Sequence, residues 1–310
     1  MRAVLAERNS TLCLGEAMVD LICERAGVPF AGADRFSPHP GGVTANTAVF
    51  AARAGAAVAI AGAVGGDSWG RWLRRRLAAE GVDVSLLRLR EREATQLALV
   101  ALDAGGEPSY RLYPGAAAPL SGIEPRVLDD ALARSVALLI TSNTLSEPAE
   151  RSLTLHARAC ALECGARVVL DCNLRLHRWP SERDAVAAVL ECVPGAALVR
   201  ANAAEATALT AERDPGRAAR RLLELGARLA VVTLGAAGVL LVGAGGALER
   251  AAAPPVQVRS VVGAGDAFTG TLLAAVAWDR ADDLQARVRA ALPEALRAAA
   301  RACETWGAYD

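Results

Sequence analysis

The chain contains no lysine, so all 34 of its basic residues are arginine. This absence excludes the phosphate-binding P-loop and the protein-kinase site, because both place a lysine on the phosphates. It also excludes catalysis through a lysine Schiff base. Any phosphate that this chain binds must therefore be held by backbone N–H groups and by arginine.

An excess of one charge and paired cysteines are also missing. The 34 basic residues are balanced by 34 acidic ones, which predicts no nucleic-acid partner and no attraction to an anionic membrane. The seven cysteines are odd in number and lack zinc-finger spacing, which favours a reducing cytoplasm. The first residues include Arg2, Glu7 and Arg8 but no long apolar core, so we expect no signal peptide.

Long apolar runs are scarce, and the one uncharged stretch that imitates a membrane span covers residues 229–248. Five glycines divide this stretch into short β-type runs. A transmembrane helix normally reads as an unbroken apolar run. We therefore expect two strands joined by a turn between Gly235 and Gly238.

Short β-type runs alternate with helical patterns over most of the second half of the chain. We expect helices at residues 124–134, 147–163, 181–191 and 215–225, and strands at 136–140, 167–170, 197–199 and 229–233. This alternation predicts an α/β fold with a doubly wound, mainly parallel sheet flanked by helices.

The first half of the chain predicts a smaller sheet beside this body. We expect strands at residues 11–14, 19–23 and 57–61, a helix at 69–80, and a loop at 27–40. Residues 95–102 and 109–112 flank a Gly-rich turn and form a hairpin signal. One domain over residues 1–310 is expected, with a small β-sheet inserted from about residues 17–40 and 94–114.

The chain is organised around a Gly-rich turn that precedes an Ala- and Leu-rich helix. We expect a strand at residues 256–262, then Gly263, Ala264, Gly265 and Asp266, then the helix. Unpaired N–H groups and the positive end of the dipole make such a helix start an anion site. Asp266 suits this place if it takes a proton from a hydroxyl that attacks phosphorus. The alternative is that Asp266 simply caps the helix.

A second Gly-Gly turn, Gly41-Gly42, also precedes a small-residue helix, with Asn46 in its first turn. Backbone amides with a carboxamide suit a neutral, hydroxyl-rich ligand, although helix capping explains the same residues. Asp20 interrupts an apolar run. Alternation in a half-exposed strand favours a place at the solvent edge; the alternative is a pocket in which Asp20 receives hydroxyl donors.

Polar residues follow several of the predicted strands. Ligands bind beyond the carboxyl ends of the strands in sheets of this type. Four such clusters together predict a single site more strongly than any one of them does. They lie at residues 171–175, 202–205, 233–235 and 263–266.

In their order and spacing, these segments resemble the ribokinase family of carbohydrate kinases, also called the phosphofructokinase-B family. The resemblance covers residues 14–302. The opening segment and the Asp-x-Asn-x-Arg cluster are most similar to fructokinases and 2-keto-3-deoxygluconate kinases. The matching segments are residues 15–20, Gly41-Gly42 with Asn46, residues 61–67, residues 171–175, Asn202 with Glu205, residues 232–235 and residues 263–266.

The resemblance implies a kinase that phosphorylates a sugar hydroxyl with ATP. Asp266 would be the catalytic base, and the N–H groups of Gly263, Ala264, Gly265 and Asp266 would hold the transferring phosphoryl group. Arg175 would reach the sugar or the phosphates as the site closes. The sugar hydroxyls would be held by Asp20, Gly41, Gly42 and Asn46.

The resemblance also implies a nucleotide site, a metal and an assembly. Asn202 and Glu205 would organise Mg²⁺, with Glu205 acting through water. ATP would be bound by Asn173, Asn202, Glu205, Thr233, Gly235 and Gly238. The small sheet would be the family's lid, which closes over the sugar and often pairs subunits, so a homodimer is expected.

Two departures from the family pattern bear on cation and substrate preference. Ser260-Val261-Val262 stands where the family often has Asp-Thr-Thr, whose Asp helps to bind a potassium-like ion, so monovalent-cation activation is in doubt. Tyr113 stands where the sugar-acid kinases carry an arginine, although Arg111 is close and could compensate. Loss of a fixed cation weakens carboxylate recognition.

We therefore expect Tyr113 to face the substrate and the substrate to be a ketohexose such as fructose. A sugar-acid kinase is the first alternative. A ribokinase or nucleoside kinase and a non-catalytic sugar sensor are further ones. A dinucleotide oxidoreductase is disfavoured, because no Gly-x-Gly-x-x-Gly follows the first strand.

Overall fold

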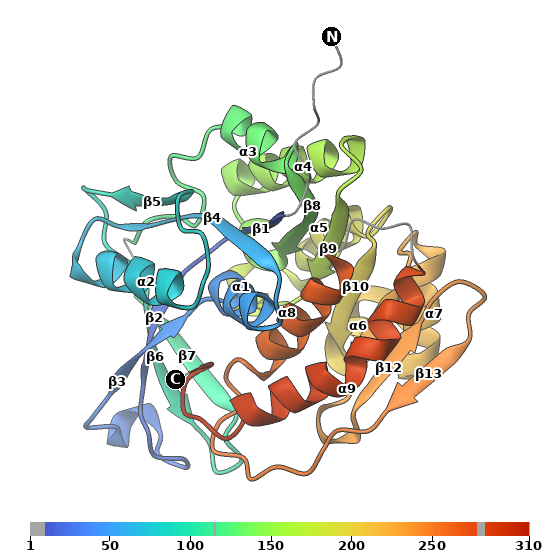
Figure 1. Cartoon of the computed structure of the whole chain (residues 1–310). Helices are drawn as coiled ribbons and strands as arrows, with labels where there is room; N and C mark the ends of the chain where they lie inside the picture. Colours follow the sequence, from blue (N-terminus) through green and yellow to red (C-terminus); the bar gives the residue numbers. More distant parts are fainter. Residues whose placement is uncertain (1–9, 114–115, 278–282, 310) are drawn as a thin grey trace.

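The computed structural model describes residues 10–113, 116–277 and 283–309. These residues form a large sheet of nine strands and a small sheet of four (Figure 1). The strand order in the large sheet is β13-β12-β11-β10-β9-β8-β1-β4-β5. Neighbouring strands from β11 to β5 are parallel, whereas β12 and β13 are added antiparallel. The predicted doubly wound, mainly parallel sheet is confirmed.

The nine strands of the large sheet are short, and most of them are buried. Their side chains alternate between two apolar clusters, so that Leu12 and Leu138 face one cluster while Cys13 and Leu139 face the other. The strands are β1 (Ser10–Leu14), β4 (Ala57–Gly65), β5 (Leu87–Arg90), β8 (Ser135–Thr141), β9 (Arg167–Asp171), β10 (Leu198–Asn202), β11 (Ala230–Thr233), β12 (Val239–Val242) and β13 (Leu248–Ala251).

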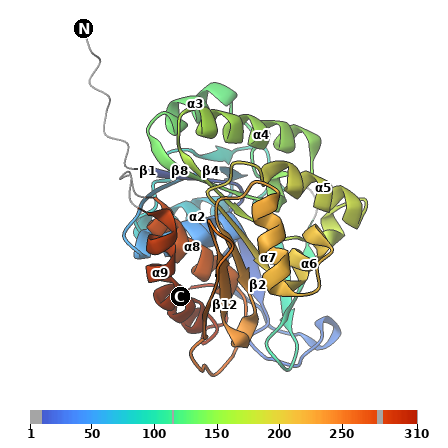
Figure 2. The same cartoon turned by 90° about the vertical axis from the view of Figure 1, so that its right-hand side faces the viewer.

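Helices cover both faces of this sheet (Figure 2). One face packs on α1 (Val43–Arg53), α2 (Ser68–Ala79), α8 (Ala264–Val276) and α9 (Leu284–Ala302). The other packs on α3 (Pro125–Leu132), α4 (Pro148–Glu163), α5 (Glu182–Cys192), α6 (Ala203–Thr210) and α7 (Pro215–Glu224). The predicted helices that correspond to α1–α5, α7 and α8 are confirmed, whereas α6 and α9 were not predicted.

The small sheet has the order β3-β2-β6-β7. Its strands are β2 (Met18–Ile22), β3 (Ser37–Gly41), β6 (Leu97–Leu102) and β7 (Pro108–Leu112). The pair β6–β7 is antiparallel, as the hairpin signal predicts, whereas β2 and β6 are parallel. The prediction of a loop over residues 27–40 is wrong at its end. Pro38 and Pro40 lie in β3, where an edge strand tolerates proline.

The strand predicted over residues 256–262 is also wrong. The amide groups of Arg259 and Ser260 both donate to the carbonyl of Cys303, and the amide of Val261 donates to that of Gly106. These amides therefore bond to the end of α9 and to the β6–β7 turn instead of a sheet ladder. Only the turn and the helix of the predicted strand–turn–helix exist, and the turn is held by tertiary contacts.

The uncharged stretch over residues 229–248 folds as predicted. It forms β11 and β12, which pair antiparallel around a short turn at Gly235–Ala237. Within the described ranges, no helix is long and apolar enough to cross a membrane.

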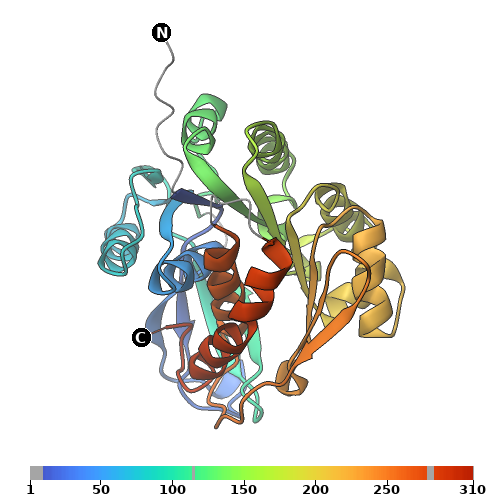
Figure 3. The same cartoon turned by 45° about the vertical axis from the view of Figure 1, so that its right-hand side comes forward.

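The last described residues, which end at 309, lie beside the small sheet (Figure 3). A Cβ added to Gly307 would stand 2.5 Å from Nδ1 of His39 in β3. A Cβ on Gly263, which precedes α8, would stand 2.3 Å from Cβ of Ala308. The last residues therefore pack between the small sheet and the start of α8.

Candidate active site

A cleft separates the small sheet from the carboxyl end of the large sheet. Residues from six separate parts of the chain line it, among them three carboxylates and two arginines. The lining residues are Glu16, Met18, Asp20, Gly42, Val43, Asn46, Tyr110, Leu112, Asn143, Arg175, His177, Arg178 and Asp266. The structure thus brings together four of the predicted polar residues, namely Asp20, Asn46, Arg175 and Asp266.

Asp266 lies in the first turn of α8 with 6% of its surface exposed. Nδ2 of Asn46 donates a hydrogen bond of 2.8 Å to its Oδ2. Burial raises the pKa of Asp266 to about 7, a rise that Asn46 and the neighbouring arginines oppose. The capping alternative is wrong, because the helix is preceded by Gly263 and no side chain caps it. Asp266 instead points into the cleft, as a base requires.

The turn before α8 offers fewer free amides than the sequence predicts. Gly263 has a φ of 77°, which favours glycine. The amide of Ala264 donates to the carbonyl of Val261 at 3.2 Å, so this amide is already paired. The amides of Gly263, Gly265 and Asp266 have no backbone acceptor among the described residues. Three of the four predicted amides therefore remain open to an anion.

Asp20 lies in β2 and is 4% exposed. The edge interpretation is therefore wrong, because this strand lies between β3 and β6. Burial raises the pKa of Asp20 to about 7, and the negative charge of Asp266 contributes less to this rise. The positive charge of Arg175 opposes it. Oδ1 of Asp20 has no hydrogen-bond partner among the described residues. A Cβ on Gly41 would stand 2.3 Å from Oδ2, which explains the glycine there.

Sequence reasoning did not assign Glu16 or Asn143. Glu16 accepts hydrogen bonds from the amide of Val43 at 3.0 Å, Oγ1 of Thr44 at 3.2 Å and Nδ2 of Asn143 at 2.9 Å. It therefore ties the start of α1 to the loop after β8. Glu16 could have been found from the sequence, because it is an acidic residue in the opening apolar segment and a buried carboxylate needs partners.

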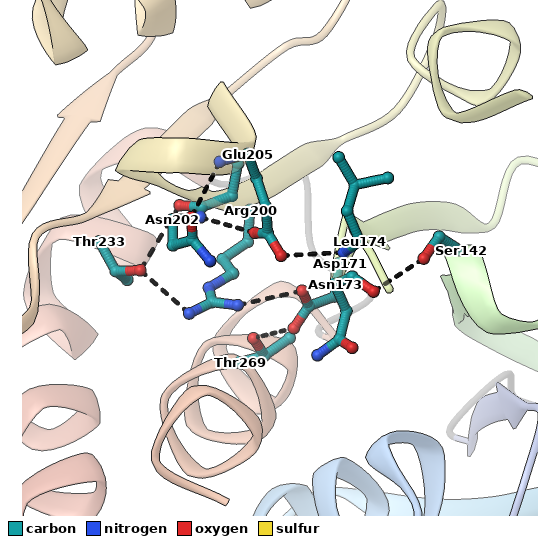
Figure 4. A network of polar contacts seen from close by, with 10 residues as sticks. Ser142, Asp171, Asn173, Leu174, Arg200, Asn202, Glu205, Thr233 and Thr269 are labelled. Carbon is teal, nitrogen blue, oxygen red and sulfur yellow. Dashed lines mark hydrogen bonds and ion pairs between the residues drawn. The ribbon is translucent and has the colours of Figure 1, made fainter. Parts of the chain in front are cut away.

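A network of polar residues joins the ends of β9, β10 and β11 to α8 (Figure 4). Asp171 accepts from Nη1 of Arg200 at 3.2 Å and from Oγ1 of Thr269 at 2.6 Å. Nη2 of Arg200 donates to Oγ1 of Thr233 at 3.0 Å. Arg200 was missed, although an arginine inside an apolar strand marks a buried, paired charge.

Asn202 and Glu205 form a capping box at the start of α6. One oxygen of Glu205 accepts from the amide of Asn202 at 2.8 Å, and the other accepts from the amide of Leu174 at 2.9 Å. Among the described residues, here or at any other place, no group of three His, Cys, Asp or Glu side chains could hold a metal ion. Both oxygens of Glu205 already accept from the backbone, and each keeps a second lone pair that a water molecule bound to a metal ion could use.

The remaining predicted residues lie in the segments that follow β9, β11 and β7. Asn173 has a φ of 34° and its buried side-chain oxygen has no partner among the described residues. Gly235 and Gly238 form the turn after Thr233. Tyr113 is 54% exposed and does not line the cleft, whereas Tyr110 and Leu112 do.

The sequence and the fold have counterparts among known proteins. The model of the pfkB family of carbohydrate kinases matches residues 8–310. Probable fructokinase-4 of Arabidopsis thaliana is 31% identical over 286 residues, covering 91% of this chain and 86% of that protein. Fructokinase-1 of Oryza sativa subsp. japonica is 32% identical, covering 86% of this chain and 82% of that protein.

Solved structures agree with these matches. The aminoimidazole riboside kinase of Salmonella enterica, in complex with aminoimidazole riboside and an ATP analog, has a TM-score of 0.82 and is 27% identical. That match covers 97% of this chain and 95% of that chain. The fructokinase of Xylella fastidiosa with bound ATP also has a TM-score of 0.82, with 27% identity and coverage of 97% and 94%.

Proposed function

Because the chain belongs to the pfkB family of carbohydrate kinases, we propose that it transfers the γ-phosphoryl group of ATP to the terminal primary hydroxyl of fructose or a similar ketohexose. Relatives named fructokinase support the choice of sugar. The absence of lysine agrees with this reaction, since a helix start and arginine can supply the positive charge.

The observation that carries the proposal is the hydrogen bond from Asn46 to Asp266 in the first turn of α8. Asn46 fixes one oxygen of the carboxylate, which orients the other toward the cleft. A base with a pKa of about 7 is ionised enough to accept a proton at neutral pH and still binds it well. Asp266 would remove the proton from the sugar hydroxyl as its oxygen attacks phosphorus.

The open amides beside Asp266 would hold the phosphoryl group during transfer. Phosphoryl transfer depends on position and charge stabilisation more than on covalent chemistry. The amides of Gly263, Gly265 and Asp266 point from the positive end of α8 and supply that stabilisation. Arg175, which lines the same cleft, would reach the sugar or the phosphates as the site closes.

ATP would lie along the ends of β9 to β11. Asn173, Asn202, Thr233, Gly235 and Gly238 lie at these strand ends or in the turn that follows β11. When bound, Mg²⁺ would neutralise charge on the phosphates, held by ATP itself and through water by Glu205.

The sugar would lie between β2 and the start of α1. The unpaired Oδ1 of Asp20 is a buried acceptor that a sugar hydroxyl can satisfy. Asn46 and the backbone at Gly41 and Gly42 would complete this end of the cleft. Tyr113 would need to move toward the cleft to contact the sugar.

The small sheet would act as a lid and as a dimer contact. It contributes Asp20, Tyr110 and Leu112 to the cleft, so its position decides how far water is excluded. Leu112 and Tyr113, at the end of the edge strand β7, are 42% and 54% exposed. Exposed apolar side chains on an edge strand favour pairing with a second copy.

A reducing cytoplasm is the proposed location. The seven cysteines, all within the described residues, form no disulfide, and burial raises the thiol pKa of five of them. Raised thiol pKa values make these cysteines poor nucleophiles, so structural burial explains them.

The test is ADP release measured over a panel of fructose, 2-keto-3-deoxygluconate, ribose and adenosine. We expect the largest kcat/KM with fructose. A larger kcat/KM with 2-keto-3-deoxygluconate would instead show that the protein is a sugar-acid kinase. No turnover with any acceptor would remove the kinase function itself.

A further inference from the structure

We infer that Arg200 is a positioning residue for phosphoryl transfer, which holds the first turn of α8 against the ends of β9 and β11 and places a buried positive charge beneath that turn. This inference rests on the proposed kinase function and deepens it. Arg200 does not line the cleft, so it acts through the turn rather than on the sugar.

The contacts of Arg200 join three strands to one helix (Figure 4). The residue is 7% exposed and comes from β10. Its two terminal nitrogens donate to Asp171 in β9 and Thr233 in β11. A planar guanidinium reaches the two acceptors from two separate nitrogens in a fixed fork, whereas an ammonium must donate to both from a single nitrogen on a flexible stem.

The same guanidinium packs directly under the anion-binding turn. A Cβ added to Gly265 would stand 3.1 Å from Nη2 and 3.2 Å from Nη1 of Arg200. One helical turn later, Thr269 donates to the second oxygen of Asp171. Arg200 therefore packs against α8 at Gly265, and Asp171 bonds to it at Thr269. Gly265 is one of the residues whose amide is open to the phosphate.

Stability alone does not account for this arginine. Buried ion pairs contribute little net stability, and apolar residues of similar volume often serve as well or better. Nε of Arg200 is buried without a partner among the described residues, which adds a further cost. A costly group at the edge of this turn is better explained by the charge and geometry that it supplies there.

The charge matters because negative charge develops at the phosphoryl group during transfer. The helix start supplies partial positive charge, and Arg200 adds a full charge that is poorly screened by solvent. Arg200 also favours the ionised form of Asp266. The charged and titratable groups that act on Asp266 come from several elements: Asp20, Tyr110, Asp171, Arg175 and Arg200.

The experiment is a double-mutant cycle with Arg200→Met, Asp171→Asn and the combined variant. Arg200→Met leaves Asp171 buried and uncompensated, so we expect its urea midpoint to fall. Asp171→Asn still accepts from Thr269, and the combined variant should recover most of the lost stability. If Arg200 positions the turn, kcat stays on the order of 100-fold low in the combined variant, with the KM for sugar nearly unchanged.

The opposite result separates the two roles. Recovery of both stability and kcat in the combined variant would show that Arg200 only balances Asp171, and the inference would be wrong. An inactive wild-type protein over the whole sugar panel would instead remove the proposed function, and the inference with it. The two failures are distinguished by wild-type turnover.

Arg200→Lys provides a second variant that tests the inference even if Arg200→Met does not fold. It keeps the charge but loses the rigid fork that bonds Asp171 and Thr233 from two separate nitrogens. We expect a folded protein with kcat lowered about tenfold and an unchanged acidic limb of its pH profile. Wild-type kcat in this variant would overturn the inference, because the two-point contact would then be unnecessary.

Discussion

Asp266→Asn should lower turnover and raise stability at the same time. The substitution removes the base, so we expect kcat to fall by a factor on the order of 10² to 10⁴. It also removes a charge that the folded protein keeps buried at neutral pH. Asn46 can still donate to the oxygen of the new carboxamide, so the packing of the cleft should change little.

The size of the stability gain follows from the pKa shift. Folding raises the pKa of Asp266 from 3.8 to about 7, a difference of about three units. One unit corresponds to about 1.4 kcal/mol, so ionised Asp266 costs the folded state up to about 4 kcal/mol. We expect Asp266→Asn to raise the free energy of unfolding by about 2–4 kcal/mol at pH 8.

The direction in which this stability gain changes with pH follows from the same shift in the pKa of Asp266. The unfolded chain releases the proton of this carboxyl near pH 3.8, whereas the folded protein keeps it until about pH 7. Between these values the folded state binds more protons, so the contribution of Asp266 to stability falls as pH rises. The gain from Asp266→Asn should therefore be small near pH 4 and reach its full value above pH 7.

Urea denaturation at pH 4 and pH 8, together with a coupled ADP assay, measures both effects. Glu150→Gln is a matched control, because Glu150 is a buried carboxyl outside the cleft lining whose pKa is also raised by burial. It should gain stability at pH 8 and keep its turnover. Near-full turnover in Asp266→Asn, or equal stability gains at both pH values, would refute the reasoning.

Three further predictions concern the same cleft. Asp20→Asn should raise the KM for sugar about tenfold or more while changing the KM for ATP little, because one buried acceptor for a sugar hydroxyl is weakened; equal changes in both KM values would contradict this place for the sugar. The kcat/KM of the wild-type protein should fall about tenfold per pH unit below pH 7 as Asp266 takes up its proton, and a flat profile down to pH 5 would argue against a base of raised pKa. Potassium should change kcat less than twofold relative to a larger monovalent cation, because Ser260 offers no carboxylate and its oxygen already accepts from the amide of Val262; strong activation would contradict this.

The sequence predicts those structural features that depend on residues close to one another along the chain. The alternation of short β-type runs and amphipathic helices predicts the parallel sheet, because its two periods are properties of the backbone. The turn at Gly263 and the helix after it were predicted for the same reason. The carboxyl-end rule then placed Asp171, Asn202 and Thr233 at one edge.

Predictions failed where a residue's environment comes from distant segments. Residues 256–262 look like a strand, but their amides bond to Cys303 and Gly106 instead. The edge placement of Asp20 followed from alternation along one strand. Only the packing of β2 between β3 and β6 decides that this side chain is buried.

The sequence by itself determined the fold class, the helix start at Gly263 and the carboxylate that follows it, because these depend on backbone periodicity and on residues a few positions apart. Only the tertiary structure decided that Asn46 reaches Asp266, that Glu16 ties α1 to Asn143 and that Arg200 lies under Gly265. Asn46 and Asp266 are 220 positions apart, Glu16 and Asn143 are 127 apart, and Arg200 and Gly265 are 65 apart. The burial that shifts the two cleft carboxyls toward neutral pH arises from the same long-range packing, which no local pattern in the chain records.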